Sequence, residues 1–134
     1  MSFSQQIAGF SQSTITKLQR TRRGVILKLF SAVILDTPVL TGRLRGAWKT
    51  TEGAPAEGDR GEVVDPSGAL PIAEAAAAVA KSEGDIPVYL TNNLPYAARI
   101  EFEGWSHTKA PQGMVRRNVA RFNRLISIEA AKNK

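Results

Sequence analysis

The chain has 134 residues, of which 43% are hydrophobic and 22% are charged, and this composition is typical of a single globular domain with a modest core. It contains no cysteine, which excludes disulfides and thiolate metal sites, and its longest apolar stretch, residues 25–35, is too short to span a bilayer. The net charge of +6 is unevenly spread, because residues 1–49 hold eight basic and one acidic residue, residues 50–110 hold four and ten, and residues 111–134 hold six and one.

Residues 4–36 are predicted to form a long amphipathic helix, so that residues 1–36 make up the N-terminal helical segment. Apolar side chains recur at helical spacing at Ile7, Phe10, Leu18, Val25, Leu29 and Val33. The pattern is also compatible with a break near residues 11–14. Gly24 weakens the middle of the helix by roughly 1 kcal/mol relative to alanine. Asp36 is expected to end the helix, because Pro38 follows closely and the residue before a proline avoids helical backbone.

The next segments are predicted to be a loop, a strand and a second loop. Residues 37–43 contain the proline and glycine of a turn, and residues 44–51 alternate like a half-buried strand, with Leu44, Gly46, Trp48 and Thr50 on one face. Residues 52–69 hold four glycines and two prolines among acidic residues, which predicts a flexible acidic loop or a long hairpin with a short strand at 61–64.

The second half of the chain is predicted to alternate between helices and one further strand. Residues 70–82 read as an alanine-rich helix that ends at Gly84, and residues 86–91 as a strand with Pro87 at its start or on a sheet edge. A turn at 92–95 precedes a helix at 96–103, which Gly104 stops before a polar loop at 105–112. Residues 111–131 form the closing helix, with an apolar side of Met114, Val119, Phe122, Leu125 and Ile126.

This order of elements predicts one α+β domain over residues 1–134. The long N-terminal helix and the C-terminal helices are expected to pack on one face of a small antiparallel sheet. Basic ends around an acidic middle suit head-to-tail contacts between identical subunits. Solvated faces and a nucleic-acid surface are the alternative interpretations of the same charge pattern.

The residue types that carry catalysis are sparse. His107 is the single histidine, and its nearest carboxylates, Glu101 and Glu103, do not have the spacing of a metal site. Neither a serine elbow nor a glycine-rich phosphate loop is present, and the carboxylates of the 52–69 loop are expected to be solvated. We therefore expect no catalytic residue, no cofactor and no metal, and a protein that is not an enzyme.

Two groups of arginines leave a small basic DNA-binding protein as the alternative from another class. Arg20, Arg22 and Arg23 cluster in the first helix, and Arg116, Arg117, Arg121 and Arg124 line the last. Such stripes can follow a phosphate backbone. Against this interpretation, the sequence lacks a helix-turn-helix pair and an aromatic platform for bases, and its middle is acidic.

Three segments carry a resemblance to a known family. Residues 37–48 (TPVLTGRLRGAW), 92–104 (NNLPYAARIEFEG) and 110–115 (APQGMV) resemble, in order and spacing, conserved segments of the tail-completion (minor tail protein Z-like) proteins of long-tailed bacteriophages. The resemblance covers most of residues 37–120. It departs from the family pattern after Gly104, where Trp105, Ser106 and His107 replace a short glycine turn, and residues 52–85 do not align.

The resemblance implies a structural virion protein of the neck, made in the host bacterial cytoplasm and located at the head–tail junction. Its partners would be copies of itself in a ring, expected to be a hexamer, the tail terminator or tail tube protein, and the head-completion or connector proteins. DNA would pass through the ring without sequence readout, and neither a membrane nor a cofactor is implied. A tail terminator or head-closure protein of the same junction is the alternative position.

The candidate subunit or partner interface consists of eight residues: Arg43, Arg45, Tyr96, Arg99, Glu101, Arg116, Arg117 and Arg121. Arg43 and Arg45 are expected to face a neighbour's carboxylate or solvent, and Tyr96 either packs internally or lies at the subunit boundary. Arg99 and Glu101 pair across subunits or form a local, exposed ion pair. Trp48 is expected to be a core anchor, because it falls on the apolar face of its predicted strand.

Overall fold

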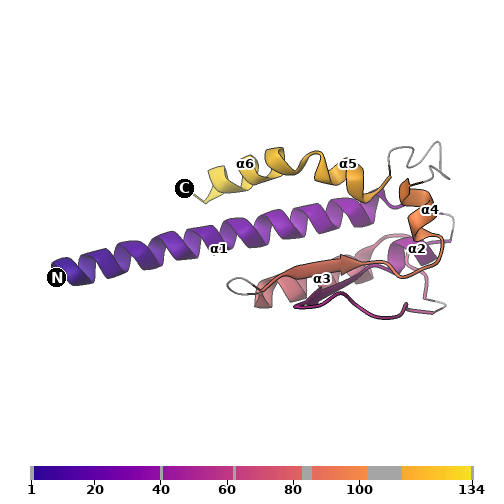
Figure 1. Cartoon of the computed structure of the whole chain (residues 1–134), viewed down its shortest axis with the longest axis horizontal. Helices are drawn as coiled ribbons and strands as arrows, with labels where there is room; N and C mark the ends of the chain where they lie inside the picture. The colour runs from indigo at the N-terminus through magenta and orange to yellow at the C-terminus, as the bar shows by residue number, and fades with distance from the viewer. Residues whose placement is uncertain (1, 40, 62, 83–85, 103–112, 134) are drawn as a thin grey trace.

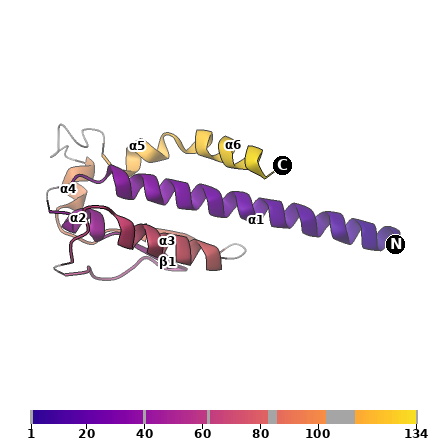
Figure 2. The ribbon, with the colours of Figure 1, turned by 180° about the vertical axis from the view of Figure 1, so that it is seen from behind.

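The computed structural model describes residues 2–39, 41–61, 63–82, 86–102 and 113–133. The helices within them are α1 (Phe3–Asp36), α2 (Arg43–Gly46), α3 (Ala69–Lys81), α4 (Ala97–Phe102), α5 (Val115–Val119) and α6 (Phe122–Lys132), and the strands are β1 (Lys49–Glu52) and β2 (Val88–Thr91). Helix α1 lies between two layers, with α5 and α6 along one side and α3 and the strands on the other (Figures 1 and 2). The predicted α+β class is confirmed.

Helix α1 is one unbroken rod of 34 residues, so the break considered near residues 11–14 does not occur. Its start is fixed by a capping box in which the Ser2 hydroxyl accepts from the Gln5 backbone N–H, while the Gln5 side chain accepts from the Ser2 N–H. The hydroxyls of Thr14 and Thr16 donate to carbonyls one turn earlier and so fit into the helix. The helix ends at Asp36, as predicted.

The predicted strand at residues 44–51 is wrong in its first half. Residues 43–46 form the helical turn α2, and β1 begins only at Lys49. Gly42 precedes the turn with a φ of 96°, a backbone conformation that favours glycine, and its carbonyl accepts from the Gly46 N–H at 2.9 Å. The turn buries Leu44, Ala47 and Trp48 together, whereas strict alternation would have pointed Ala47 away from the other two.

Strands β1 and β2 pair antiparallel, with Lys49 opposite Thr91 and Glu52 opposite Val88. The strand predicted at 86–91 is therefore confirmed from Val88 onward, with Pro87 directly before it. The short strand predicted at 61–64 is wrong, since none of the described residues 61, 63 and 64 is in a strand. Side chains hold this acidic loop instead: Arg60 donates to the carbonyls of Gly46 and Trp48 and pairs with Glu74 on α3 at 2.7 Å.

The single closing helix predicted for residues 111–131 is also wrong. Its described part divides into α5 and α6, with a break at Ala120 and Arg121. The buried side chains of these two helices are Asn118 and Glu129, while Val119 on the predicted apolar side is exposed. The predicted stops at Gly84 and Gly104, the polar loop at 105–112 and His107 lie outside the described residues.

Gly24 explains how α6 approaches α1 so closely. A Cβ at this position would overlap the Glu129 carboxylate, so a side chain here would displace that carboxylate. Glu129 forms ion pairs with Lys28 on α1 and with Lys132 on its own helix. The glycine that weakens the helix by propensity therefore allows α6 to lie against it.

The apolar core lies where the C-terminal end of α1 meets α2, α4 and α5. Its buried members are Val33, Ile34, Leu44, Ala47, Trp48, Leu94, Ala97, Ile100 and Met114. All of them come from residues 33–114, so the core uses the second half of α1 and leaves the first half outside it.

Candidate functional site

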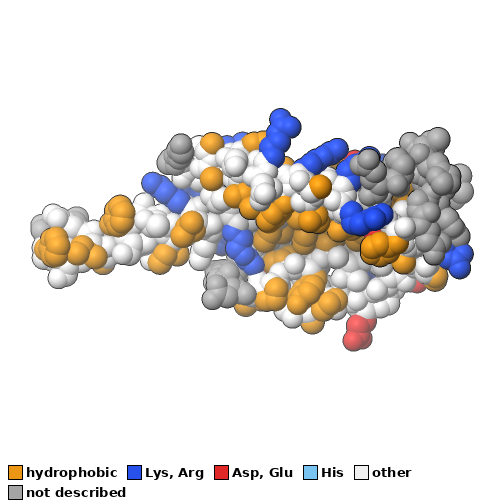
Figure 3. Space-filling model, turned by 45° about the horizontal axis from the view of Figure 1, so that its top comes forward, with side chains coloured by type: hydrophobic (Ala, Val, Ile, Leu, Met, Phe, Trp, Pro, Cys, Tyr) orange, Lys and Arg blue, Asp and Glu red, His pale blue; other side chains and the backbone are white. Residues whose placement is uncertain are grey.

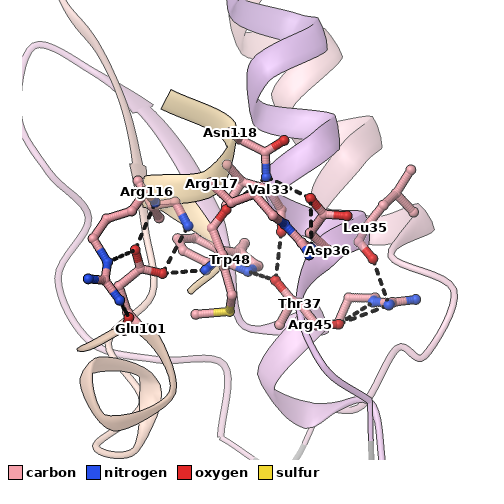
Figure 4. A network of polar contacts seen from close by, with 12 residues as sticks. Val33, Leu35, Asp36, Thr37, Arg45, Trp48, Glu101, Arg116, Arg117 and Asn118 are labelled. Atoms are coloured by element: carbon pink, nitrogen blue, oxygen red, sulfur yellow. Dashed lines mark hydrogen bonds and ion pairs between the residues drawn. The ribbon is translucent and has the colours of Figure 1, made fainter. Parts of the chain in front are cut away.

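A buried threonine is the centre of a polar network beside the core. The Thr37 hydroxyl donates to the Val33 carbonyl at 2.8 Å and accepts from the Trp48 indole N–H at 2.8 Å (Figure 4). Both side chains are buried, so each polar atom meets its partner away from water. Trp48 is confirmed as a core anchor.

Arg45 binds the C-terminal end of α1. Its guanidinium donates to the carbonyls of Leu35 at 2.8 Å, Thr37 at 2.8 Å and Pro66 at 2.8 Å (Figure 4). The last carbonyls of a helix lack partners and carry partial negative charge, which an arginine neutralises well. These donors are used inside the subunit, but Arg45 is partly exposed, so its contact with a neighbour or solvent stays a prediction.

Glu101 is the most tightly held carboxylate. It is 6% exposed, and it accepts from the backbone N–H groups of Met114, Val115 at 2.9 Å and Arg116 at 2.8 Å (Figure 4). The Arg116 side chain adds a contact at 3.3 Å and also donates to the Glu101 carbonyl. The prediction of an exposed ion pair for Glu101 is wrong, because this carboxylate binds the N-terminal turn of α5.

The same contacts determine how Glu101 titrates. Burial alone would raise the pKa of this carboxyl, but the backbone hydrogen bonds from Arg116, Val115 and Met114, together with the Arg116 side chain, lower it overall. Glu129 also has a lowered pKa, mainly through its hydrogen bond with Lys28. Both groups are therefore carboxylates at neutral pH.

Helix α5 is tied to the end of α1 through Asp36. Its carboxylate pairs with Arg117 at 3.1 Å and accepts from the Asn118 side chain at 2.8 Å (Figure 4). Asn92 links the segment before α4 to α2, because its side-chain amide donates to the Leu44 carbonyl at 2.9 Å. The predicted interface residue Arg117 thus has an intramolecular partner.

These contacts join the three segments that carry the family resemblance. Thr37 and Trp48 belong to the first segment, Asn92 and Glu101 to the second, and Met114 to the third. Hydrogen bonds run within the first segment, from the second to the first, and from the third to the second. Segments far apart in the sequence thus form one structural unit.

The remaining candidate interface residues lie around this unit rather than in one cluster. Arg43 donates to the Gly61 carbonyl at 2.8 Å, and Tyr96 is half-buried against the core. Arg99 and Arg121 are exposed. Arg116 is partly exposed, and its guanidinium lies 5.3 Å from the centre of the Phe102 ring. The structure therefore does not bring the eight predicted residues together into one surface.

The arginines that suggested DNA binding also have internal partners. Arg22 donates to the Ser82 hydroxyl at 3.0 Å and to the Ile86 carbonyl at 2.5 Å, and Arg23 donates to the Ser82 carbonyl. With Arg116 and Arg117 held as described above, four of the seven arginines of the two clusters contribute to folding contacts. These intramolecular contacts reduce the number of guanidinium donors that the two clusters can direct at a phosphate backbone.

The most exposed apolar surface is on the N-terminal half of α1, named here the rod (residues 3–18). It carries five exposed large apolar side chains: Phe3, Ile7, Phe10, Ile15 and Leu18. Phe3 and Phe10 are 76% and 75% exposed, and Figure 3 shows apolar groups along the projecting arm. The sequence pattern placed Ile7, Phe10 and Leu18 on an apolar face but did not predict that no described part of the chain covers this face.

A second apolar surface is a groove between α1, β2 and α5. It has a volume of about 190 Å³ and is lined by Leu29, Phe30, Val33, Trp48, Val88, Tyr89, Leu90, Val115 and Val119. In Figure 3, apolar side chains gather in the hollow between the α5–α6 layer and the strands. The described residues leave this groove open to solvent.

Within the described part of the chain, no three acidic or histidine side chains are grouped so that they could hold a metal ion. No described helix, α1 included, is apolar enough over a sufficient length to cross a membrane. Comparison with family models, with curated proteins and with solved structures finds no match.

Proposed function

We propose that this protein is a non-enzymatic structural subunit of a tailed bacteriophage, a tail-completion protein that forms a ring at the head-proximal end of the tail and joins the tail to the head. The observation that carries the proposal is the contact between the three resembling segments. Hydrogen bonds of Asn92 and Glu101 connect the three segments that the resemblance selects, and the bond between Thr37 and Trp48 lies within the first of them. Residues that are connected in this way are expected to maintain the fold that members of a family share.

The distribution of charge supports a role in assembly. Helices α1, α5 and α6, which lie side by side in Figure 1, come from the two basic ends of the chain. The exposed acidic residues that the structure describes in segment 50–110 lie at the end of β1 and in the loop between β1 and α3, namely Glu52, Glu57 and Asp59, and the half-buried Asp65 belongs to the same loop. One subunit therefore presents basic helices and an acidic loop, and copies arranged head to tail would bring opposite charges together.

The proposed partners in the virion are copies of this chain, the tail terminator or tube, and the head-completion proteins. DNA passes through the ring without sequence readout. A tail terminator or head-closure position in the same junction requires similar surfaces and is the closest alternative. A small DNA-binding protein would instead bind duplex DNA as an isolated monomer with a steep dependence on salt.

The test is disruption of this reading frame in the phage genome that carries it. We expect lysates in which filled heads and complete tails accumulate unattached, as seen by electron microscopy, and joining restored by adding the purified chain. Normal, infectious, joined particles in the absence of the chain would contradict the proposal. A lysate without any tails would instead indicate a role earlier in tail assembly.

A further inference from the structure

The rod continues an apolar stripe that the rest of α1 uses for folding. At about 100° per residue, the stripe residues fall within a sector of about 140° of the helix surface, which on the rod also contains Ser4, Ser11 and Thr14. Its members are Phe3, Ile7, Phe10, Leu18, Val25, Leu29 and Val33. Val25 and Val33 are buried against the rest of the subunit, whereas Phe3, Phe10 and Leu18 are exposed. The stripe thus extends past the elements that cover it (Figure 1).

The rod also lacks the charges of a solvated helix. Residues 3–16 contain no Lys, Arg, Asp or Glu, and their polar side chains are serine, threonine and glutamine. A low content of charged residues, together with aromatic side chains at the surface, distinguishes the centre of a protein interface from ordinary surface. A helix that is apolar on one side and uncharged on the others is expected to lie against another protein.

The groove lined by Val88, Val115 and Val119 is a suitable acceptor. Its volume of about 190 Å³ is below the roughly 300–1,000 Å³ of small-molecule sites, and its lining is almost wholly apolar, so that it suits side chains of a helix better than a ligand. The rod cannot reach the groove of its own subunit, because Leu29 and Phe30 of the groove belong to the same unbroken helix. A rod that fills this groove must therefore belong to another molecule.

Charge near the groove favours the rod as this occupant. Glu52 is exposed and lies directly opposite Val88 in the sheet, so its side chain shares the face of the sheet on which Val88 lines the groove. Lys17 and Arg20 lie at the C-terminal end of the rod, on either side of Leu18, and α1 has no acidic residue before Asp36. The positive charges of Lys17 and Arg20 at the C-terminal end of the rod are complementary to the negative charge of Glu52 beside the groove.

We propose that the rod of one subunit docks in the groove of the next, so that each copy both gives and receives a helix. The inference rests on the proposed ring, for which it supplies the subunit contact. A contact of this head-to-tail kind is heterologous, and it forms a ring when the rotation between neighbours closes. Phe3 and Phe10, two turns or about 10 Å apart, are the anchors.

Because the chain has no cysteine, engineered cysteines test this contact cleanly. Ile7→Cys is placed in the stripe between the two phenylalanines, and Val119→Cys or Val88→Cys in the groove. When a rod variant and a groove variant are mixed and oxidised with diamide, a mixed disulfide dimer is the expected product on a non-reducing gel. A chain with both Ile7→Cys and Val119→Cys should give a ladder of covalent multimers.

The matched controls are Gln12→Cys, outside the stripe sector of the rod, and Val64→Cys, an exposed valine outside the groove. Pairs that contain either control should not crosslink above background. Ile7→Cys dimers formed without a groove cysteine would show that rods pair with each other and would overturn the inference, as would equal crosslinking in all pairs or in none. These outcomes concern the subunit contact alone, since the reading-frame disruption tests the role in the virion.

Discussion

The two halves of α1 have a similar sequence pattern and opposite environments. In the second half, Val25, Val33 and Ile34 are buried, and Arg22, Arg23 and Lys28 contact α3's end, the β2 segment or α6. In the rod, every residue from Phe3 to Leu18 except Thr16 is exposed. Apolar periodicity therefore identifies a face that needs a partner, but it does not say whether the partner belongs to the same chain.

The difference between the halves lies in what accompanies the apolar stripe. Around the buried half, basic side chains find carboxylates and carbonyls within the subunit. Around the rod there are no charged side chains over residues 3–16. The buried half serves folding, and under the proposed docking the rod serves assembly, so that substitutions in the two halves should affect different properties.

The largest contrast is expected between two aromatic truncations. Trp48→Ala removes a buried ring and the donor to Thr37, and it should lower the free energy of unfolding by about 3–5 kcal/mol. Phe10→Ala removes an exposed ring and should change the unfolding of the dilute monomer by less than about 0.5 kcal/mol. Urea titrations followed by circular dichroism measure both, and a large loss for Phe10→Ala would contradict the division of α1.

The second contrast concerns a held carboxylate and a solvated one. Glu101→Gln removes a charge and places an amide N–H₂ among backbone donors, which should cost about 1–3 kcal/mol of unfolding free energy. Glu57→Gln, at an exposed loop position, should leave the urea midpoint unchanged. Equal midpoints for the two variants at pH 7 would show that the Glu101 contacts do not stabilise the fold.

The pH dependence sharpens this point. Because the folded-state pKa of Glu101 is lowered below its ordinary value of 4.5, its contribution to stability is present in full above that value and is lost as the pH falls through the lower folded-state pKa. The lowered pKa values of Glu129 and Asp65 act in the same direction. The wild-type urea midpoint should fall with acidification below about pH 5, and Glu101→Gln should fall less steeply. Parallel profiles would contradict this assignment.

Two glycines of α1 provide a smaller contrast. Gly9 has open space where a Cβ would lie, so Gly9→Ala should stabilise the rod by about 0.5–1 kcal/mol. Gly24→Ala would meet the Glu129 carboxylate and disturb its ion pairs, and it should lose this gain or destabilise the protein. Amide hydrogen exchange of the rod and urea titration of the whole chain measure the two effects. An equal gain at both positions would argue against close contact between α1 and α6.

The smallest effect on the urea midpoint of the whole chain is expected at the start of the rod. Ser2→Ala removes the hydroxyl that accepts from the Gln5 N–H, a loss of about 1 kcal/mol in helix stability. Because the rod lies outside the core, the change should appear as faster hydrogen exchange over the first turns and leave the urea midpoint unaffected. A shifted midpoint would mean that the rod unfolds together with the core.

The sequence was informative where local signals decide the structure. Pro38 marked the end of α1, the alanine-rich run gave α3, and Trp48 was correctly assigned to the core. It was misleading at residues 44–48, because a helical turn after Gly42 buries Leu44 and Trp48 just as a strand would. Alternation alone does not distinguish the two.

The polar contacts were harder to predict, because they depend on tertiary structure. Glu101 looked like one partner of a local pair, yet it binds the backbone of α5 more than ten residues later. Asn118 and Glu129 interrupt an apolar pattern, and only the positions of Asp36 and Lys28 on α1 explain their burial. The rod was detectable from its uncharged composition, but only the fold shows that its apolar side chains are exposed among the described residues.

The most direct test of the central claim is the solution mass of the full chain by sedimentation equilibrium, compared with that of Phe10→Ser and Gln12→Ser. We expect the wild type to associate beyond its monomer mass of 14.5 kDa as concentration rises, Gln12→Ser to behave alike, and Phe10→Ser to associate about thirty-fold more weakly. A rod that is not an assembly surface would leave all three chains with the same mass at every concentration.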